Sequence, residues 1–148
     1  MRTIESAIEI DAPPERVWEE LIDFEEYVEW NPFIPRASGE ARVGHRLTIK
    51  IEPPGAREFT FTPKVTVVEE PRRLAWLGRV GLPHLFDGRH SFHLEPLADG
   101  ERTRFRQHEV FGGVLVPLLL REGAIQRGFD AMNAALKRRV ERKAPVKA

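Results

Sequence analysis

The chain has 148 residues, of which 41% are hydrophobic and 31% are charged, and this composition is typical of one soluble globular domain. Lys plus Arg and Asp plus Glu are equal at 23 each, so no net charge attracts nucleic acid or an anionic membrane. The absence of cysteine excludes disulfides, thiolate metal sites and a cysteine nucleophile. We therefore expect a single domain over residues 1–148.

The N-terminus lacks the charged start and apolar run of a secretory signal peptide. The longest apolar run, residues 114–120, is far shorter than the ~20 residues that span a membrane. These two features predict a cytoplasmic protein without a membrane span.

The first elements are a strand and two short helices. Residues 3–10 alternate between apolar and polar side chains, which predicts a half-buried strand. Asp11 and the prolines that follow it suit the first turn of a helix, which continues with an apolar face to Ile22. A second short helix follows and ends at Asn31-Pro32.

From Phe33 onward the period is mostly two, which predicts six strands joined by turns. Pro63 lies inside one of these runs and indicates a bulge or an edge position. A break falls at Gly81-Leu82-Pro83, and Asp99-Gly100 is a strong hairpin signal. Short turns favour antiparallel neighbours, and we expect the first strand to pair with the last. The six predicted strands cover residues 36–40, 45–52, 59–67, 73–79, 89–95 and 102–111.

Residues 114–140 predict one long C-terminal helix. Apolar side chains recur there at steps of three and four, with Glu122 on the same face, and Pro117 falls near the first turn. Such a helix is about 40 Å long at roughly 1.5 Å per residue. We expect the sheet to curve around it and to leave a cavity between the two, while the tail after Val140 frays.

This order of elements, with IDAPPERVW at residues 10–18 and WNPF at residues 30–33, resembles the START-like or SRPBCC superfamily. That superfamily includes polyketide cyclase/dehydrase-like and Bet v 1-like proteins. The resemblance implies an α+β helix-grip fold, in which a seven-stranded antiparallel sheet grips the C-terminal helix and two short helices close one end. It also implies a hydrophobic ligand between sheet and helix, but the fold serves many functions and does not name the ligand.

Polar residues on the inner face of the sheet are the candidate site residues, because burying an unpaired polar group costs ~1–3 kcal/mol. If Asp99-Gly100 form a tight turn, His90 lies opposite Glu109, and Phe92 lies opposite Gln107. Glu95 and Arg104 then form an outward charge pair. Glu109 would orient His90, and His90 would exchange protons with a ligand. Alternatively, the pair is a satisfied polar contact in a partly hydrated core.

Aromatic side chains add candidates for the cavity wall, with Trp76 the best of them. His90 and His93 point to opposite faces of their strand, so we predict no metal site, and no cofactor is indicated. The basic cluster at residues 137–143 predicts a solvated helix end rather than a nucleic-acid surface. The predicted ligand-binding residues are Trp76, His90, Phe92, Gln107, Glu109, Phe111, Glu122 and Phe129.

Three functions follow as hypotheses. The first is binding of a hydrophobic or amphipathic small molecule, lipid-like or polyketide-like, with no catalysis. The second is a cyclase- or aromatase-like enzyme that uses His90 and Glu109 as an acid–base pair. The third is a protein-interaction module like the Hsp90-activator branch of the superfamily. The sequence leaves a homodimer open.

Overall fold

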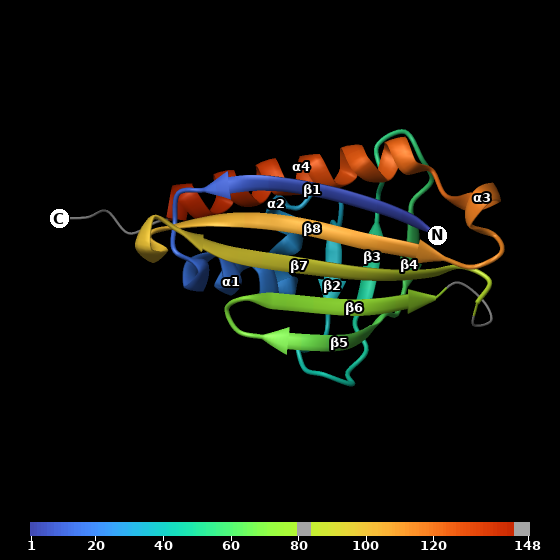
Figure 1. Cartoon of the computed structure of the whole chain (residues 1–148), viewed down its shortest axis with the longest axis horizontal. Helices are drawn as coiled ribbons and strands as arrows, with labels where there is room; N and C mark the ends of the chain where they lie inside the picture. Colours follow the sequence, from blue (N-terminus) through green and yellow to red (C-terminus); the bar gives the residue numbers. More distant parts are fainter. Residues whose placement is uncertain (80–83, 144–148) are drawn as a thin grey trace.

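A five-stranded antiparallel sheet forms the main layer of the protein (Figure 1). A computed structural model describes residues 1–79 and 84–143, so the predicted break at residues 81–83 and the end of the predicted tail lie outside the described residues. The strand order is β1-β8-β7-β6-β5, and β1 pairs with β8 as predicted. The strands are β1 (Arg2–Ile10), β5 (Lys64–Glu69), β6 (Arg73–Arg79), β7 (Asp87–Leu97) and β8 (Arg102–Gly112).

A second sheet of three strands holds β2 (Arg36–Ser38), β3 (Thr48–Ile51) and β4 (Phe59–Phe61). The prediction of one seven-stranded sheet was therefore wrong in its strand count. The predicted strand over residues 59–67 is divided between the two sheets at Pro63, which has no N–H to donate to a ladder. The sheets stay joined where Leu47 N donates to Pro63 O at 2.9 Å and Val65 N donates to His45 O at 2.8 Å.

Two short helices follow β1 as predicted, namely α1 (Pro14–Ile22) and α2 (Tyr27–Trp30), with a 3-10 turn η1 (Phe24–Glu26) between them. Proline occupies the first position of α1, where a backbone N–H would have no intrahelical acceptor, so its absence costs no hydrogen bond. Tyr27 is fully buried, and its hydroxyl donates to the carbonyl of Leu21. Burial, together with the nearby Asp23 and Glu20 carboxylates, raises the pKa of Tyr27, so this donor stays protonated.

The C-terminal helix is not continuous, which corrects the prediction of one helix from Val114 to Val140. A single turn α3 (Val116–Leu119) ends at Leu120, whose backbone is extended, and α4 (Glu122–Lys143) then begins. Before α3, Leu115 N donates to Leu85 O at 2.9 Å, and this bond holds the chain away from the line of α4. The break lets Val116 join the core, where its side chain is only 3% exposed.

Helix α4 runs along the five-stranded sheet beside β1, and its first residues lie near the β3–β4 loop and α3 (Figure 1). Its buried face includes Phe129, Met132, Leu136 and Val140. Gly128 on this face admits the ring of Phe33, which would lie 2.2 Å from a Cβ at that position. The fold is therefore α+β, with a long C-terminal helix gripped by antiparallel sheets.

The C-terminal half of α4 is tied to α1 by ion pairs. Glu20 on α1 is 7% exposed and lies 3.3 Å from Arg139 and 3.0 Å from Lys143. Lys137 donates to Glu141 at 2.6 Å one turn away. Part of the predicted basic cluster is thus engaged with acidic side chains of the same chain.

Candidate functional site

The hairpin of β7 and β8 has the register that the sequence predicted. His90 pairs with Glu109, Phe92 pairs with Gln107, and Glu95 pairs with Arg104. The connection is a turn in which Glu101 N donates to Ala98 O at 3.2 Å, with Asp99 and Gly100 at positive φ between them. The outward ion pair of Glu95 is made with Arg106, at 3.6 Å, rather than with its direct partner Arg104.

A chain of polar side chains crosses the layer between the sheet and α4. His90 Nδ1 lies 2.9 Å from Glu109 Oε1, and His90 Nε2 lies 3.0 Å from Gln107 Oε1. Gln107 Nε2 donates to Asn133 Oδ1 on α4 at 2.7 Å. Asn133 Nδ2 donates to Ser6 Oγ at 2.9 Å, and Ser6 donates to the carboxylate of Asp130. Side chains from β1, β7, β8 and α4 therefore satisfy one another in and beside the core.

The donors and acceptors of this chain all run in one direction. Asp130 as a carboxylate accepts only, so Ser6 donates to it and accepts from Asn133. The Gln107 amide is held in the same sense by a second acceptor, the carbonyl of Phe129 at 3.4 Å. The oxygen of Gln107 consequently faces His90, and Nε2 of His90 must carry a hydrogen. A second hydrogen lies between Nδ1 of His90 and Oε1 of Glu109, because the hydrogen bond that joins these two atoms requires one.

Aromatic rings enclose His90 on several sides. Its ring centroid lies 4.4 Å from that of Phe92, 5.0 Å from Phe129 and 5.4 Å from Trp76. His90 is 3% exposed, and both of its ring nitrogens have partners. The imidazole is therefore held in place and has no free edge toward a ligand.

Glu109 is the member of the pair that reaches open space. Its Oε2 lies where a Cβ on Gly88 would come within 2.4 Å, so a side chain at position 88 would push the carboxylate from its place. Glu109 lines a small inner pocket of about 40 Å³, otherwise walled mainly by apolar side chains such as Phe61, Phe86 and Phe111. That volume holds a water molecule or two.

A larger hollow, the outer groove, adjoins the inner pocket. It measures about 510 Å³ and shares Phe59, Phe86, Phe111 and Ile125 with the inner pocket. Small-molecule sites are typically apolar clefts of roughly 300–1,000 Å³, so the outer groove is large enough for a ligand and the inner pocket is not. The remaining walls of the outer groove come from the β3–β4 loop and the α3–α4 junction. They include Pro53, Ala56, Arg57, Leu120 and Arg121.

The predicted ligand-binding residues divide into three groups. Glu109 and Phe111 line the inner pocket, and Phe111 also lines the outer groove. The second group is packed in the core and lines neither space: Trp76, His90, Phe92, Gln107 and Phe129. Glu122 lies apart from the polar chain, because the break before α4 puts it at the helix start, where its half-exposed side chain is 3.8 Å from Arg2.

Sequence reasoning missed Asn133, Asp130 and the two groove arginines. Asn133 is 2% exposed and follows the buried Phe129 by four residues, which is one helical turn. A polar residue at that spacing on an otherwise apolar face was the available signal. Arg57 and Arg121 lie in connections between elements, where periodicity carries no information.

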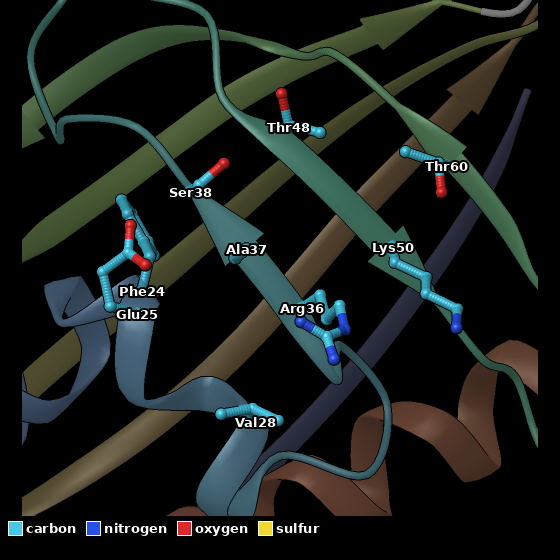
Figure 2. A pocket seen from close by; sticks show the side chains of 9 residues that line it. All are labelled: Phe24, Glu25, Val28, Arg36, Ala37, Ser38, Thr48, Lys50 and Thr60. Atoms are coloured by element: carbon cyan, nitrogen blue, oxygen red, sulfur yellow. The ribbon is translucent and has the colours of Figure 1, made fainter.

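A third hollow, of about 290 Å³, lies on the outer side of the three-stranded sheet (Figure 2). Polar side chains of β2, β3 and β4 line it, among them Arg36, Ser38, Thr48 and Lys50, and Glu25 of η1 lies at its edge (Figure 2). None of the predicted site residues contributes to it. Lys50 is already engaged there by Glu52 and Glu58, each at 3.4 Å.

Two other kinds of site are not found over residues 1–79 and 84–143. In this part of the chain, no three side chains of His, Asp or Glu gather where they could hold a metal ion. No helix among the same residues is both long and apolar enough to cross a bilayer.

Residues 1–141 match the protein family described as polyketide cyclase / dehydrase and lipid transport, and the chain belongs to this family. No curated protein matches it. It resembles the Zhui aromatase/cyclase from Streptomyces sp. R1128, with a TM-score of 0.75 and 20% identity over 98% of this chain and 96% of that one.

Two further solved structures show the same fold. A START superfamily protein from Mycobacterium smegmatis has a TM-score of 0.73 and 21% identity, over 95% of this chain and 97% of that chain. A protein from Thermus thermophilus has a TM-score of 0.76 and 19% identity, over 97% of this chain and 100% of that chain. At these identities the likeness concerns the fold, and the function has to be argued from the site.

Proposed function

We propose that this protein binds a hydrophobic or amphipathic small molecule in the outer groove, at the N-terminal end of α4. The observation that carries the proposal is the volume of about 510 Å³ together with its mostly apolar lining. Membership of a family described in part by lipid transport supports the same function.

The polar chain behind the groove fits a binding role. Buried polar side chains that are fully paired fix the spacing of the sheet and α4, and the groove is built on that spacing. Phe111 and Ile125, on β8 and α4, are then held at a set separation as two walls of the groove. A largely preformed site loses little conformational entropy when a ligand enters.

The test uses N-phenyl-1-naphthylamine, a neutral fluorophore that brightens in apolar surroundings. Titration into the wild-type protein should give saturable binding. Ala56→Trp places an indole in the groove wall and should weaken that binding at least tenfold. Val43→Trp adds the same side chain at a position that is 59% exposed and outside the groove, and it should bind as the wild type does. Equal binding by both variants would contradict the proposal.

A second candidate is acid–base catalysis on a polyketide-like substrate, favoured by the Glu109 carboxylate that faces apolar space with His90 behind it. In that case Glu109, rather than His90, removes the proton from a carbon between two carbonyl groups. A linear poly-β-ketone thioester should then cyclise faster with the wild type than with Glu109→Gln, while both bind the naphthylamine alike. No acceleration by the wild type would remove this candidate.

The exposed large apolar side chains give no specific support to a protein-interaction module. Among the described residues they are Met1, Val28, Val43, Phe59 and Val114. Two of them lie at different hollows, Val28 at the hollow of Figure 2 and Phe59 at the outer groove. A docking surface would be expected to gather such residues in one patch.

A further inference from the structure

We infer that the ligand carries an anionic headgroup, which two arginines hold at the mouth of the outer groove while the apolar body points inward. This inference rests on the proposed function and names the class of ligand: an amphiphile with one carboxylate, sulfonate or phosphate group. It is carried by the placement of Arg57 and Arg121 and by the charges of the residues around them.

Arg57 and Arg121 reach the groove from two different connections. Arg57 follows the β3–β4 turn, and Arg121 lies between α3 and α4. Both line the same hollow and both are exposed, so they keep their charge and can approach one group from two segments. Guanidinium groups donate pairs of parallel N–H bonds that match the oxygens of such anions.

No acidic side chain within the described residues forms an ion pair with either arginine. The neighbouring acids are occupied elsewhere, because Glu122 pairs with Arg2 at 3.8 Å and Glu58 pairs with Lys50 at 3.4 Å. Among the other arginines of this region, Arg79 lies 3.7 Å from Asp87. Arg127 donates to the Pro54 carbonyl at 3.4 Å and keeps its charge near the loop, but it does not line the groove. Arg57 and Arg121 are therefore the cations that line the groove itself.

The charges at the two ends of the groove set the direction of the ligand. The inner end adjoins Glu109, whose carboxylate and His90 together supply no net positive charge to an anion. An anionic headgroup placed there would meet this carboxylate among mainly apolar walls, where repulsion and desolvation both oppose it. Arg79 also lines the inner pocket, but it is already paired with Asp87 at 3.7 Å. At the mouth the same headgroup meets two guanidinium groups and water. The apolar body consequently lies along Phe59, Phe86 and Ile125.

Two fluorophores with the same apolar body test this inference. N-phenyl-1-naphthylamine is neutral. 8-Anilino-1-naphthalenesulfonate has the same phenylaminonaphthalene body and carries one sulfonate group on it. In the double variant Arg57→Gln/Arg121→Gln, the affinity for the sulfonate probe should fall at least tenfold, while that for the neutral probe should stay within about twofold. Raising the NaCl concentration should weaken binding of the sulfonate probe alone.

The matched control is Arg138→Gln/Arg142→Gln, which removes the same charge from exposed positions near the far end of α4. It should leave both affinities within about twofold of the wild type. If the groove variant binds the sulfonate probe as tightly as this control does, while the neutral probe binds normally, the headgroup site is overturned and the proposed function stands. If neither probe binds the wild type, the proposed function fails, and this inference fails with it.

Discussion

His90 and Glu109 face each other across β7 and β8, with Nδ1 of the imidazole 2.9 Å from Oε1 of the carboxylate. Gln107 occupies the other ring nitrogen at 3.0 Å and is itself fixed by Asn133 and the Phe129 carbonyl. The position of the Glu109 carboxylate therefore depends on the position of α4, through the hydrogen bonds of His90 and Gln107. Glu109, which lines the inner pocket, is the end of a chain that begins at the surface with Asp130.

The direction of this chain predicts the protonation of one nitrogen. Nε2 of His90 should carry a hydrogen at neutral pH, because its partner Gln107 Oε1 can only accept. Long-range nitrogen–proton NMR correlations of the His90 ring should show a protonated Nε2. In Gln107→Glu the acceptor is retained, and the same pattern should persist. A spectrum in which Nε2 is the unprotonated nitrogen would contradict the hydrogen-bond order described above.

Removing the centre of the chain should destabilise the fold. Gln107→Leu leaves Nε2–H of His90 and Oδ1 of Asn133 buried without partners, and the expected loss in the free energy of unfolding is about 2–4 kcal/mol. Urea denaturation measures it. Gln126→Leu is the control, because Gln126 is partly exposed and its lost bond to Glu5 O is replaced by water, so about 1 kcal/mol or less is expected. An equal loss of unfolding free energy in the two variants would contradict the claim that Gln107 joins His90 to Asn133 inside the core.

Gly88 should be required for the position of Glu109. A Cβ there would lie 2.4 Å from Oε2, so Gly88→Ala should displace the carboxylate, weaken its bond to His90 and cost about 1–3 kcal/mol of unfolding free energy. Gly112→Ala, near the end of the neighbouring strand, meets nothing within 4 Å and should cost less than about 0.5 kcal/mol. Thermal unfolding of the two variants gives the comparison. A Gly88→Ala protein as stable as Gly112→Ala would mean that the carboxylate has space elsewhere.

The register of the β7–β8 hairpin could be predicted because one turn signal fixes every pair in an antiparallel ladder. Asp99-Gly100 set the pairing of His90 with Glu109 from the far end of the hairpin, and the alternation of apolar residues independently placed both on the inner face. The predicted pairing of β1 with β8 is confirmed as well.

The break between α3 and α4 could not be read from the sequence in the same way. Residues 114–120 keep a helical spacing of apolar side chains, and the chain leaves the helix there because its backbone bonds to residues 84 and 85. Such contacts are tertiary and leave no local pattern. The same break moved Glu122 out of the predicted polar patch and placed Arg121 at the groove.

Stability should decrease as the pH falls, partly through His93 on the outer face of the sheet. Burial lowers the pKa of His93, and the guanidinium groups of Arg106 and Arg73 act in the same direction, while Glu95 opposes them. The folded-state pKa is thus below the unfolded value of about 6.5, so the unfolded chain binds more protons as pH drops below that value. The contribution is fully present above pH ~6.5 and is lost as pH falls toward the folded-state pKa.

Urea denaturation between about pH 7.5 and pH 5 measures this dependence. His93→Gln should flatten the fall in unfolding free energy, because Gln does not titrate. Val43→Gln, at a position that is 59% exposed, removes no titrating group and should leave the slope unchanged. A wild-type slope in the His93 variant would show that this imidazole is protonated equally easily in both states.

The most direct test of the account maps the binding site by NMR. Amide shifts of the ¹⁵N-labelled protein on addition of N-phenyl-1-naphthylamine should be largest in residues 55–59, at Phe86 and Phe111, and across residues 120–125, the walls of the outer groove. Residues 36–38 and 48–50, around the hollow of Figure 2, should change little. Shifts centred on residues 36–50, or no saturable shifts at all, would contradict the claim that the groove at the start of α4 is the ligand site.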